Sequence, residues 1–154
     1  MNFKHNWVLS DKLLVGEAPQ NKENLNLLKK YNIKSILCLC DENEFQLNDE
    51  ILNNFKFTRV VLPDHKNNRS ITFTEIRKSL STLINFLKEG KVYIHCFAGL
   101  ERSPLICMGY LMYSKNITLI ESLEYLMSVN PGTSPMQRNL DQLEKFFFNK
   151  ENLI

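Results

Sequence analysis

"YIHCFAGLERSPLICMGYLMY", from Tyr93 to Tyr113, joins an apolar strand-like run to an apolar helix-like run through one short loop. The strand-like run ends at Cys96, and the helix-like run begins at Arg102. Backbone N–H groups at the start of a helix lack helical partners, and the helix dipole adds partial positive charge there. Gly99 permits the tight turn that lets such N–H groups converge. The segment therefore predicts an anion-binding loop at the end of a strand.

Strand-like and helix-like segments alternate along the rest of the chain, which predicts an α/β fold. The predicted strands are 7–9, 13–16, 33–40, 55–63 and 91–96, of which the first two form a hairpin. The predicted helices are 21–32, 48–54, 72–90, 103–115, 118–129 and 134–148. We expect one domain over residues 1–154, with a mostly parallel central sheet of about five strands flanked by helices. Ligands of such sheets bind beyond the carboxyl ends of strands, where Cys96 lies.

Three of the predicted helices begin with a capping box, in which a Ser or Thr and the residue three positions later bond each other's backbone amides. The boxes pair Thr72 with Glu75, Thr118 with Glu121, and Ser134 with Gln137. Pro135 then occupies the favoured first position of the last helix. These signals predict where each of the three helices begins.

The composition is that of an ordinary globular protein, with 44% hydrophobic and 23% charged residues. The formal net charge of +2 is too small to indicate a nucleic-acid or membrane partner. The first residues contain no apolar stretch of the kind found in a signal peptide. The longest apolar stretch, 105–113, is far shorter than the roughly 20 residues of a membrane-spanning helix. We therefore expect a cytoplasmic protein.

The four cysteines form no C-x-x-C pair and have no histidine at a spacing suited to zinc, so we expect no metal and no cofactor. Cys38 and Cys40 face the same side of one predicted strand and are expected to pack in the core. An alternative is that Cys40 protects Cys96 as a reversible disulfide partner. Cys107 falls on the helix behind the loop and is expected to be buried.

Cys96 is either a small buried side chain or a nucleophile that faces an anion. Its neighbours favour the nucleophile, because His, Gly, Arg and Ser suit an anion-binding loop better than a core. A thiol at a helix N-terminus beside an arginine ionises readily, and its thiolate can attack a bound phosphomonoester. Arg102 offers a planar fork that matches two phosphate oxygens. Ser103 can donate a hydrogen bond to the sulfur, and His95 is expected to hold the loop.

The leaving oxygen of a phosphomonoester needs a proton from a carboxylic acid on a separate loop. Asp64 follows Pro63 at the end of the preceding predicted strand, on the same sheet edge as Cys96. It is either this general acid or a plain turn residue, and its position at the strand edge favours the acid. The neighbouring His65 is expected to be solvated. Three cations either line the rim of the site or belong to a solvated face: Lys66, Arg69 and Arg138.

The segment "HCFAGLERS" matches the H-C-x5-R-[ST] signature of cysteine-dependent protein phosphatases. The chain as a whole resembles the dual-specificity phosphatase family of the protein tyrosine phosphatase superfamily. "LPDHKNNRSI" is similar to the general-acid loop of that family, and "NPGTSPMQRNLDQLEKF" is similar to its closing turn and last helix. The similarity runs from about residue 7 to residue 148 and implies the fold of that family.

The resemblance implies Cys96 as the nucleophile, Asp64 as the general acid and Arg102 as the phosphate clamp. Ser103 would help the thiolate to depart, and His95 would support the loop. The implied backbone donors to the substrate are the residues between nucleophile and clamp, namely Phe97, Ala98, Gly99, Leu100 and Glu101. Glu101 must then point away from the phosphate, because its carboxylate would repel an anion.

The expected function is that of a cysteine-dependent phosphatase acting on phosphotyrosine and phosphoserine/phosphothreonine of proteins through a cysteinyl-phosphate intermediate. The loops contain no insertion that would build a deep tyrosine-only pocket. Alternative substrates are a phosphoinositide, an RNA 5′-phosphate or a phosphorylated sugar; the lack of basic residues in 97–101 disfavours the first two. A non-catalytic phospho-binding module is a further alternative, which the presence of Cys96, Arg102 and Asp64 disfavours.

Overall fold

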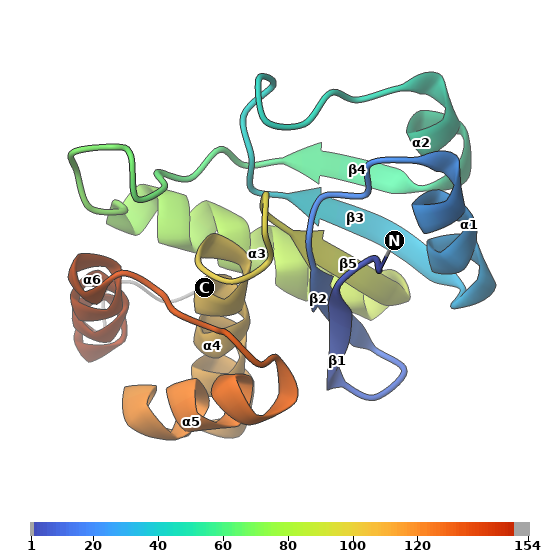
Figure 1. Ribbon diagram of the computed structural model, residues 1–154. Helices are drawn as coiled ribbons and strands as arrows, with labels where there is room; N and C mark the ends of the chain where they lie inside the picture. Colours follow the sequence, from blue (N-terminus) through green and yellow to red (C-terminus); the bar gives the residue numbers. More distant parts are fainter. Residues whose placement is uncertain (1, 150–154) are drawn as a thin grey trace.

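The computed structural model describes residues 2–149, which form one five-stranded sheet and the helices around it (Figure 1). The strands are β1 (His5–Leu9), β2 (Leu13–Gly16), β3 (Ile33–Cys38), β4 (Lys56–Arg59) and β5 (Lys91–His95). They lie in the order β1-β2-β5-β3-β4, with β1 antiparallel to β2 and all other neighbours parallel. The predicted α/β fold with a mostly parallel sheet is confirmed.

The helices lie on both sides of this sheet. They are α1 (Lys22–Lys30), α2 (Asp49–Asn54), α3 (Phe73–Glu89), α4 (Arg102–Lys115), α5 (Leu119–Val129) and α6 (Gln137–Phe148). α3 and α4 pack against the sheet with α5 and α6 beside α4, whereas α1 and α2 lie along β3 and β4 (Figure 1). None of the helices in the described part of the chain is long and apolar enough to cross a membrane.

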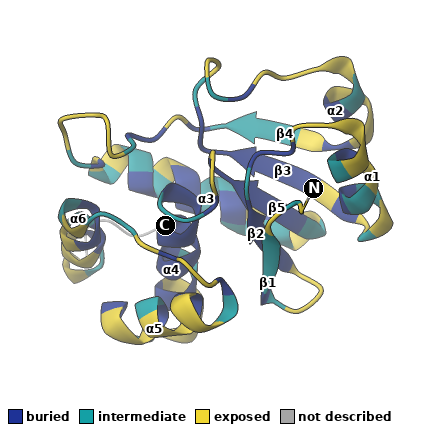
Figure 2. Ribbon diagram, viewed as in Figure 1, coloured by how far each residue is buried: buried dark blue, intermediate teal, exposed yellow. Residues whose placement is uncertain are grey.

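Helix α4 is buried over most of its surface, unlike the other helices, which each have an exposed side (Figure 2). Its sequence "PLICMGYLM" is apolar all round, as a helix surrounded by protein must be. Its neighbours are α3, α5, α6 and the central strands β2 and β5. The N-terminal end of α4, at Arg102, is therefore held in place by the core rather than by solvent-exposed contacts.

Two of the three predicted capping boxes are present, at Thr72 and at Thr118. The third was wrong: α6 begins at Gln137, and its N-cap is Met136, which has no side-chain capping bond. A long-range contact explains the difference, because the backbone N–H of Ser134 donates to the Leu100 carbonyl at 2.7 Å. The chain therefore stays extended through Met136, and Pro135 is not the first helical residue.

The predicted strand over 55–63 was also wrong at its end, since β4 stops at Arg59. Its partner β3 stops at Cys38, two residues short of the predicted end, so the following residues have no strand to pair with. Only two further backbone bonds connect the segments, from Val60 N to the Cys38 carbonyl at 2.9 Å and from Leu62 N to the Leu39 carbonyl at 3.2 Å. Asp64 therefore lies on a long loop that runs from residue 60 to residue 72.

Candidate active site

The loop between β5 and α4, residues 96–101 (the Cys96 loop), is held in place through its carbonyl oxygens. These oxygens accept hydrogen bonds from His95 Nδ1 (to Cys96, 3.0 Å), Ala18 N (to Phe97, 3.0 Å), Asn130 Nδ2 (to Gly99, 3.0 Å) and Ser134 N (to Leu100, 2.7 Å). Within residues 2–149, the backbone N–H groups of 97–101 have no hydrogen-bond acceptor. The carbonyl oxygens of the loop thus bind to surrounding parts of the protein, and its backbone N–H groups remain available to bind an anion.

Gly99 is the one position of the Cys96 loop where the backbone conformation demands glycine. Its φ of +76° lies in the left-handed region. A Cβ on Gly99 would stand 2.5 Å from the carbonyl carbon of Gly16 and 2.8 Å from the amide nitrogen of Glu17. The loop can therefore pack against the end of β2 only because this residue has no side chain.

Cys96 lies at the bottom of this loop, with 2% of its surface exposed. Its Sγ is 3.2 Å from the hydroxyl oxygen of Ser103, which is fully buried in the first turn of α4. The pair is thus placed as the sequence predicts for a thiolate and its hydrogen-bond donor. The next residue along the loop, Phe97, is 53% exposed.

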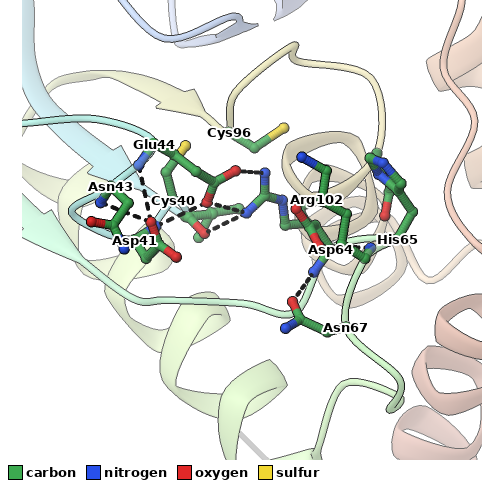
Figure 3. Close-up of polar contacts among 12 residues, drawn as sticks. Cys40, Asp41, Asn43, Glu44, Asp64, His65, Asn67, Cys96 and Arg102 are labelled. Atoms are coloured by element: carbon green, nitrogen blue, oxygen red, sulfur yellow. Dashed lines mark hydrogen bonds and ion pairs between the residues drawn. The ribbon is translucent and has the colours of Figure 1, made fainter.

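Arg102 is a buried cation held by a carboxylate that sequence reasoning missed. Its Nη1 and Nη2 donate to the two carboxylate oxygens of Glu44 at 2.9 and 2.7 Å, and Nη1 also lies 3.4 Å from the Leu39 carbonyl (Figure 3). The Nε of Arg102 is buried without a partner. The fork is therefore anchored at its tip, and Nε remains free to bind a substrate oxygen.

The charges of Arg102 and Glu44 stabilise each other. Burial disfavours the charged guanidinium, but the hydrogen bonds to Glu44 and the negative charge of that carboxylate raise the pKa of Arg102 above its ordinary value. The same hydrogen bonds are the main cause that lowers the pKa of Glu44 below its ordinary value. Both groups are consequently ionised around neutral pH, and the arginine is oriented before a substrate arrives.

Glu44 is itself positioned by a turn that follows β3. The carboxylate of Asp41 accepts hydrogen bonds from the amides of Asn43 and Glu44 at 2.9 and 3.0 Å, and the Asp41 amide donates to Glu44 at 3.1 Å. The only sequence signal for this site was the acidic segment "DENE" after a predicted strand. Because β3 and β5 are parallel neighbours, the segment emerges at the same sheet edge as Cys96.

Asp64 lies near Arg102, on the loop of residues 60–72 (the Asp64 loop; Figure 3). Its carboxylate accepts a hydrogen bond from Lys66 N at 2.8 Å, and its own amide donates to the Asn67 side chain at 2.9 Å. Partial burial is the largest single influence on the pKa of Asp64, and burial alone would raise it. The amides of Lys66 and Asn67 and the charges of Arg102 and His65 together outweigh burial, so the pKa lies below its ordinary value.

Glu101 turns toward the Asp64 loop rather than into the Cys96 loop. One of its oxygens pairs with His65 Nδ1 at 3.2 Å, and the other is buried without a hydrogen-bond partner. His65 is exposed, as expected, yet it forms the contact between the two loops. The orientation meets the requirement that the carboxylate should not face a bound anion.

Two of the three cations named as rim candidates already have partners. Arg69 forms two hydrogen bonds with the carboxylate of Glu75, at 2.8 and 2.9 Å. Arg138 donates to the carbonyl of Asn67 and so braces the Asp64 loop. Lys66 is exposed beside Asp64 and lines a polar cleft together with Asp41, Glu44 and Pro63.

Known proteins that resemble the chain belong to one family. Residues 13–148 match the family model described as the dual specificity phosphatase catalytic domain. Dual specificity protein phosphatase 1 of Arabidopsis thaliana is 32% identical over 79% of the chain and 61% of its own length. A probable dual specificity protein phosphatase of Dictyostelium discoideum is 32% identical over 100% of the chain and 68% of its own length.

The fold also matches solved structures. PTPMT1 in complex with PI(5)P aligns with a TM-score of 0.81 at 18% identity, covering 96% of each chain. The curated relatives include longer proteins: the chain spans 61% of the Arabidopsis relative named above and 32% of the Drosophila melanogaster phosphatase Mpk3.

Proposed function

The chain belongs to the dual-specificity phosphatase family, and from this membership we propose that it hydrolyses phosphomonoesters of proteins through a cysteinyl-phosphate intermediate. The observation that carries the proposal is the arrangement of three groups around one loop. Cys96 lies beneath free backbone amides, Ser103 contacts its sulfur at 3.2 Å, and Arg102 is oriented at the mouth by Glu44.

In the first step, the thiolate of Cys96 attacks the phosphorus atom in line with the ester oxygen. A sulfur–phosphorus bond forms while the phosphorus–ester oxygen bond breaks, and the leaving oxygen takes the proton of the Asp64 carboxylic acid. The negative charge of the transferring group is met by the amides of 97–101 and by the Nε side of Arg102. Each of these donors is fixed before the reaction starts, so little reorganisation is needed.

In the second step, a water molecule attacks phosphorus and gives a proton to the Asp64 carboxylate. The sulfur–phosphorus bond breaks, inorganic phosphate leaves, and Cys96 returns to the thiolate. The hydroxyl of Ser103 donates a hydrogen bond to the departing thiolate sulfur across the observed 3.2 Å contact. The same carboxyl group thus serves first as acid and then as base.

The distribution of charge favours a substrate with a single phosphate. Phe97, Ala98, Gly99, Leu100 and Glu101 bring no cation into the loop. The cleft beside Arg102 has the carboxylates of Asp41, Glu44 and Asp64 in its wall, and Arg69 is neutralised by Glu75. A substrate with several phosphates would meet these carboxylates with few free cations, whereas a phosphorylated side chain of a protein brings only one phosphate.

A phosphoinositide is the second candidate substrate, because the structural neighbour PTPMT1 binds PI(5)P. Lys66 is the cation of the cleft that would receive a further phosphate of such a ligand. The two candidates therefore differ in their dependence on Lys66.

Hydrolysis of p-nitrophenyl phosphate tests the chemistry. We expect turnover by the wild type, a loss of at least about 10³-fold in Cys96→Ser, and turnover close to wild type in Cys107→Ala, whose side chain is buried in α4 and takes no part in the proposed reaction. Equal turnover by wild type and Cys96→Ser would refute the covalent mechanism.

A panel of phosphotyrosine and phosphothreonine peptides, PI(5)P and a phosphorylated sugar tests the substrate class. We expect the highest kcat/KM on the peptides, with Lys66→Ala changing it less than about tenfold. A preference for PI(5)P that disappears in Lys66→Ala would overturn the protein substrate in favour of the lipid.

A further inference from the structure

Behind the Cys96 loop, a second group of reactive side chains remains without a role in the proposed reaction. The thiols of Cys38 and Cys40 and the imidazole of His95 lie so close together that their ligand atoms are all within 4.8 Å of one another. All three residues are fully buried. Two sulfurs and one imidazole nitrogen are the ligand types that zinc and similar thiophilic cations prefer.

The sheet brings these residues together although they are far apart in sequence. β3 and β5 are parallel neighbours, and their register pairs Cys38 directly with His95. Cys40 follows two positions after Cys38, and the amide of the intervening Leu39 bonds the His95 carbonyl at 2.9 Å. Sequence spacing predicted no zinc site, because zinc patterns count residues along the chain and not across a sheet.

The hydrogen bonds of His95 leave one ring nitrogen available for a cation. Nδ1 lies 3.0 Å from the Cys96 carbonyl, which can only accept, so Nδ1 carries the hydrogen. Nε2 then carries a lone pair, yet it is buried and has no hydrogen-bond partner. A metal-ligating histidine almost always donates its other ring N–H to a carbonyl or carboxylate in this way.

The thiols have outer contacts of the kind that support metal ligands. Arg59 Nη1 lies 3.6 Å from the sulfur of Cys38 and donates to the Cys40 carbonyl at 2.7 Å. A guanidinium that donates to the Cys38 sulfur favours the thiolate form of that residue. Phe45 covers the cluster, with its ring edge-on to the His95 ring at a centroid distance of 4.9 Å.

We propose that Cys38, Cys40 and His95 form a binding site for a thiophilic divalent cation of the zinc class. The ion would bind the two sulfurs and Nε2, and the two thiol protons would be released to solvent. Tetrahedral zinc holds its ligand atoms about 3.8 Å apart, so the side chains need to close by about 1 Å at most. Two thiolates and a neutral imidazole balance the charge of the ion, which suits a buried site.

Occupancy would fix the ends of β3 and β5 directly beneath the nucleophile, because His95 immediately precedes Cys96. The site does not use Cys96 itself. Its existence is therefore independent of the proposed phosphatase reaction, and the two can be tested separately.

Titration with cobalt(II) under a non-thiol reductant tests the site, because thiolate–cobalt charge-transfer and tetrahedral ligand-field bands report the ligands directly. We expect one equivalent to bind wild type with both signals, and Cys38→Ser and Cys40→Ser each to lose about half of the charge-transfer intensity and at least about tenfold in affinity. Cys96→Ser and Cys107→Ala are the matched controls and should bind as wild type does. Binding that is lost in Cys96→Ser would overturn the proposal, since the ion would then sit on the active-site thiol.

Thermal unfolding supplies a second readout that does not depend on activity. Zinc at about 100-fold its dissociation constant should raise the Tm of wild type by roughly 5–10 °C and leave the Tm of Cys38→Ser unchanged. The far-ultraviolet circular dichroism of Cys38→Ser without metal should match wild type, which shows that the variant folds. Equal shifts of the Tm by zinc in both proteins would refute the site. The site would also be refuted if wild-type protein forms a Cys38–Cys40 or Cys40–Cys96 disulfide and then binds no cobalt once that disulfide is reduced.

Discussion

The two loops that make up the candidate active site are held in different ways. The Cys96 loop is fastened by hydrogen bonds from distant parts of the chain, at Ala18, Asn130 and Ser134, and its nucleophile is almost fully buried. The Asp64 loop is exposed over residues 65–69, and the bonds around its acid come from neighbours within three residues. The phosphate cradle is thus fixed by several long-range hydrogen bonds, whereas the acid is fixed by a local turn that Arg138 braces through the Asn67 carbonyl.

This difference matches the demands of the two roles. A cradle must present several donors to one anion at once, and small displacements of such donors are costly. A general acid has to reach one oxygen and then one water molecule, which a single carboxylate on a local turn can do. The pair of Glu101 and His65 connects the two loops. Variants on either side should therefore have separable effects.

Among the substitutions that compare the two loops, Asp64→Asn should lower kcat the most. We expect kcat to fall about 10²–10⁴-fold on phosphopeptides and less on p-nitrophenyl phosphate, whose leaving group needs little protonation. Because the pKa of Asp64 is lowered, its protonated form becomes scarce as pH rises, so wild-type kcat/KM should fall on the alkaline side. Asp64→Asn should lack this fall, and an unchanged pH profile would show that another group is the acid.

Replacing Glu44 by Gln tests how strongly the Cys96 side depends on its anchors. The amide can keep one hydrogen bond to Arg102 but loses the ion pair, so the guanidinium is less firmly oriented. We expect kcat/KM to fall about 10²-fold, with a normal pH profile. The control is Glu42→Gln, an exposed carboxylate two residues earlier. If both variants behave alike, Glu44 has no positioning role.

Replacing Asn130 by Ala removes one of the distant fastenings of the Cys96 loop. The buried amide of Asn130 donates to the Gly99 carbonyl and accepts from Asn6 at 2.8 Å, so the substitution leaves buried polar groups unpaired. We expect the free energy of unfolding to drop by about 1–3 kcal/mol in urea denaturation. Asn53→Ala, at an exposed position of α2, should change it by less than about 0.5 kcal/mol. A similar loss in both proteins would show that the loop is not fastened here.

Breaking the contact between the loops should have the smallest effect. His65→Asn removes the partner of Glu101 from an exposed position, where ion pairs contribute about 0.2–1 kcal/mol, equivalent to at most about fivefold in kcat. The double variant His65→Asn with Glu101→Gln tests whether the two residues act together. Purely additive effects on kcat would mean that the pair does not couple the loops.

Much of the fold could be predicted because its signals are local. The capping boxes at Thr72 and Thr118 depend on residues three positions apart, and both are present. The box predicted at Ser134 failed because the amide of that residue bonds a carbonyl far earlier in the chain, at Leu100. The predicted ends of β3 and β4 were wrong for the same reason, since a strand stops where its partner strand stops.

The amino-acid sequence by itself determined the candidate nucleophile, its clamp and its hydroxyl neighbour, because Cys96, Arg102 and Ser103 lie on one loop and its following helix turn. Only the tertiary structure decided which groups hold that loop. Glu44 accepts hydrogen bonds from Arg102, and Asn130 donates to the Gly99 carbonyl. Cys38 lies opposite His95 because β3 pairs with β5, which the order of the segments in the chain does not specify. Local backbone conformation depends on residues that are neighbours in the sequence. Contacts across a sheet depend on register and packing, which exist only once the whole chain has folded.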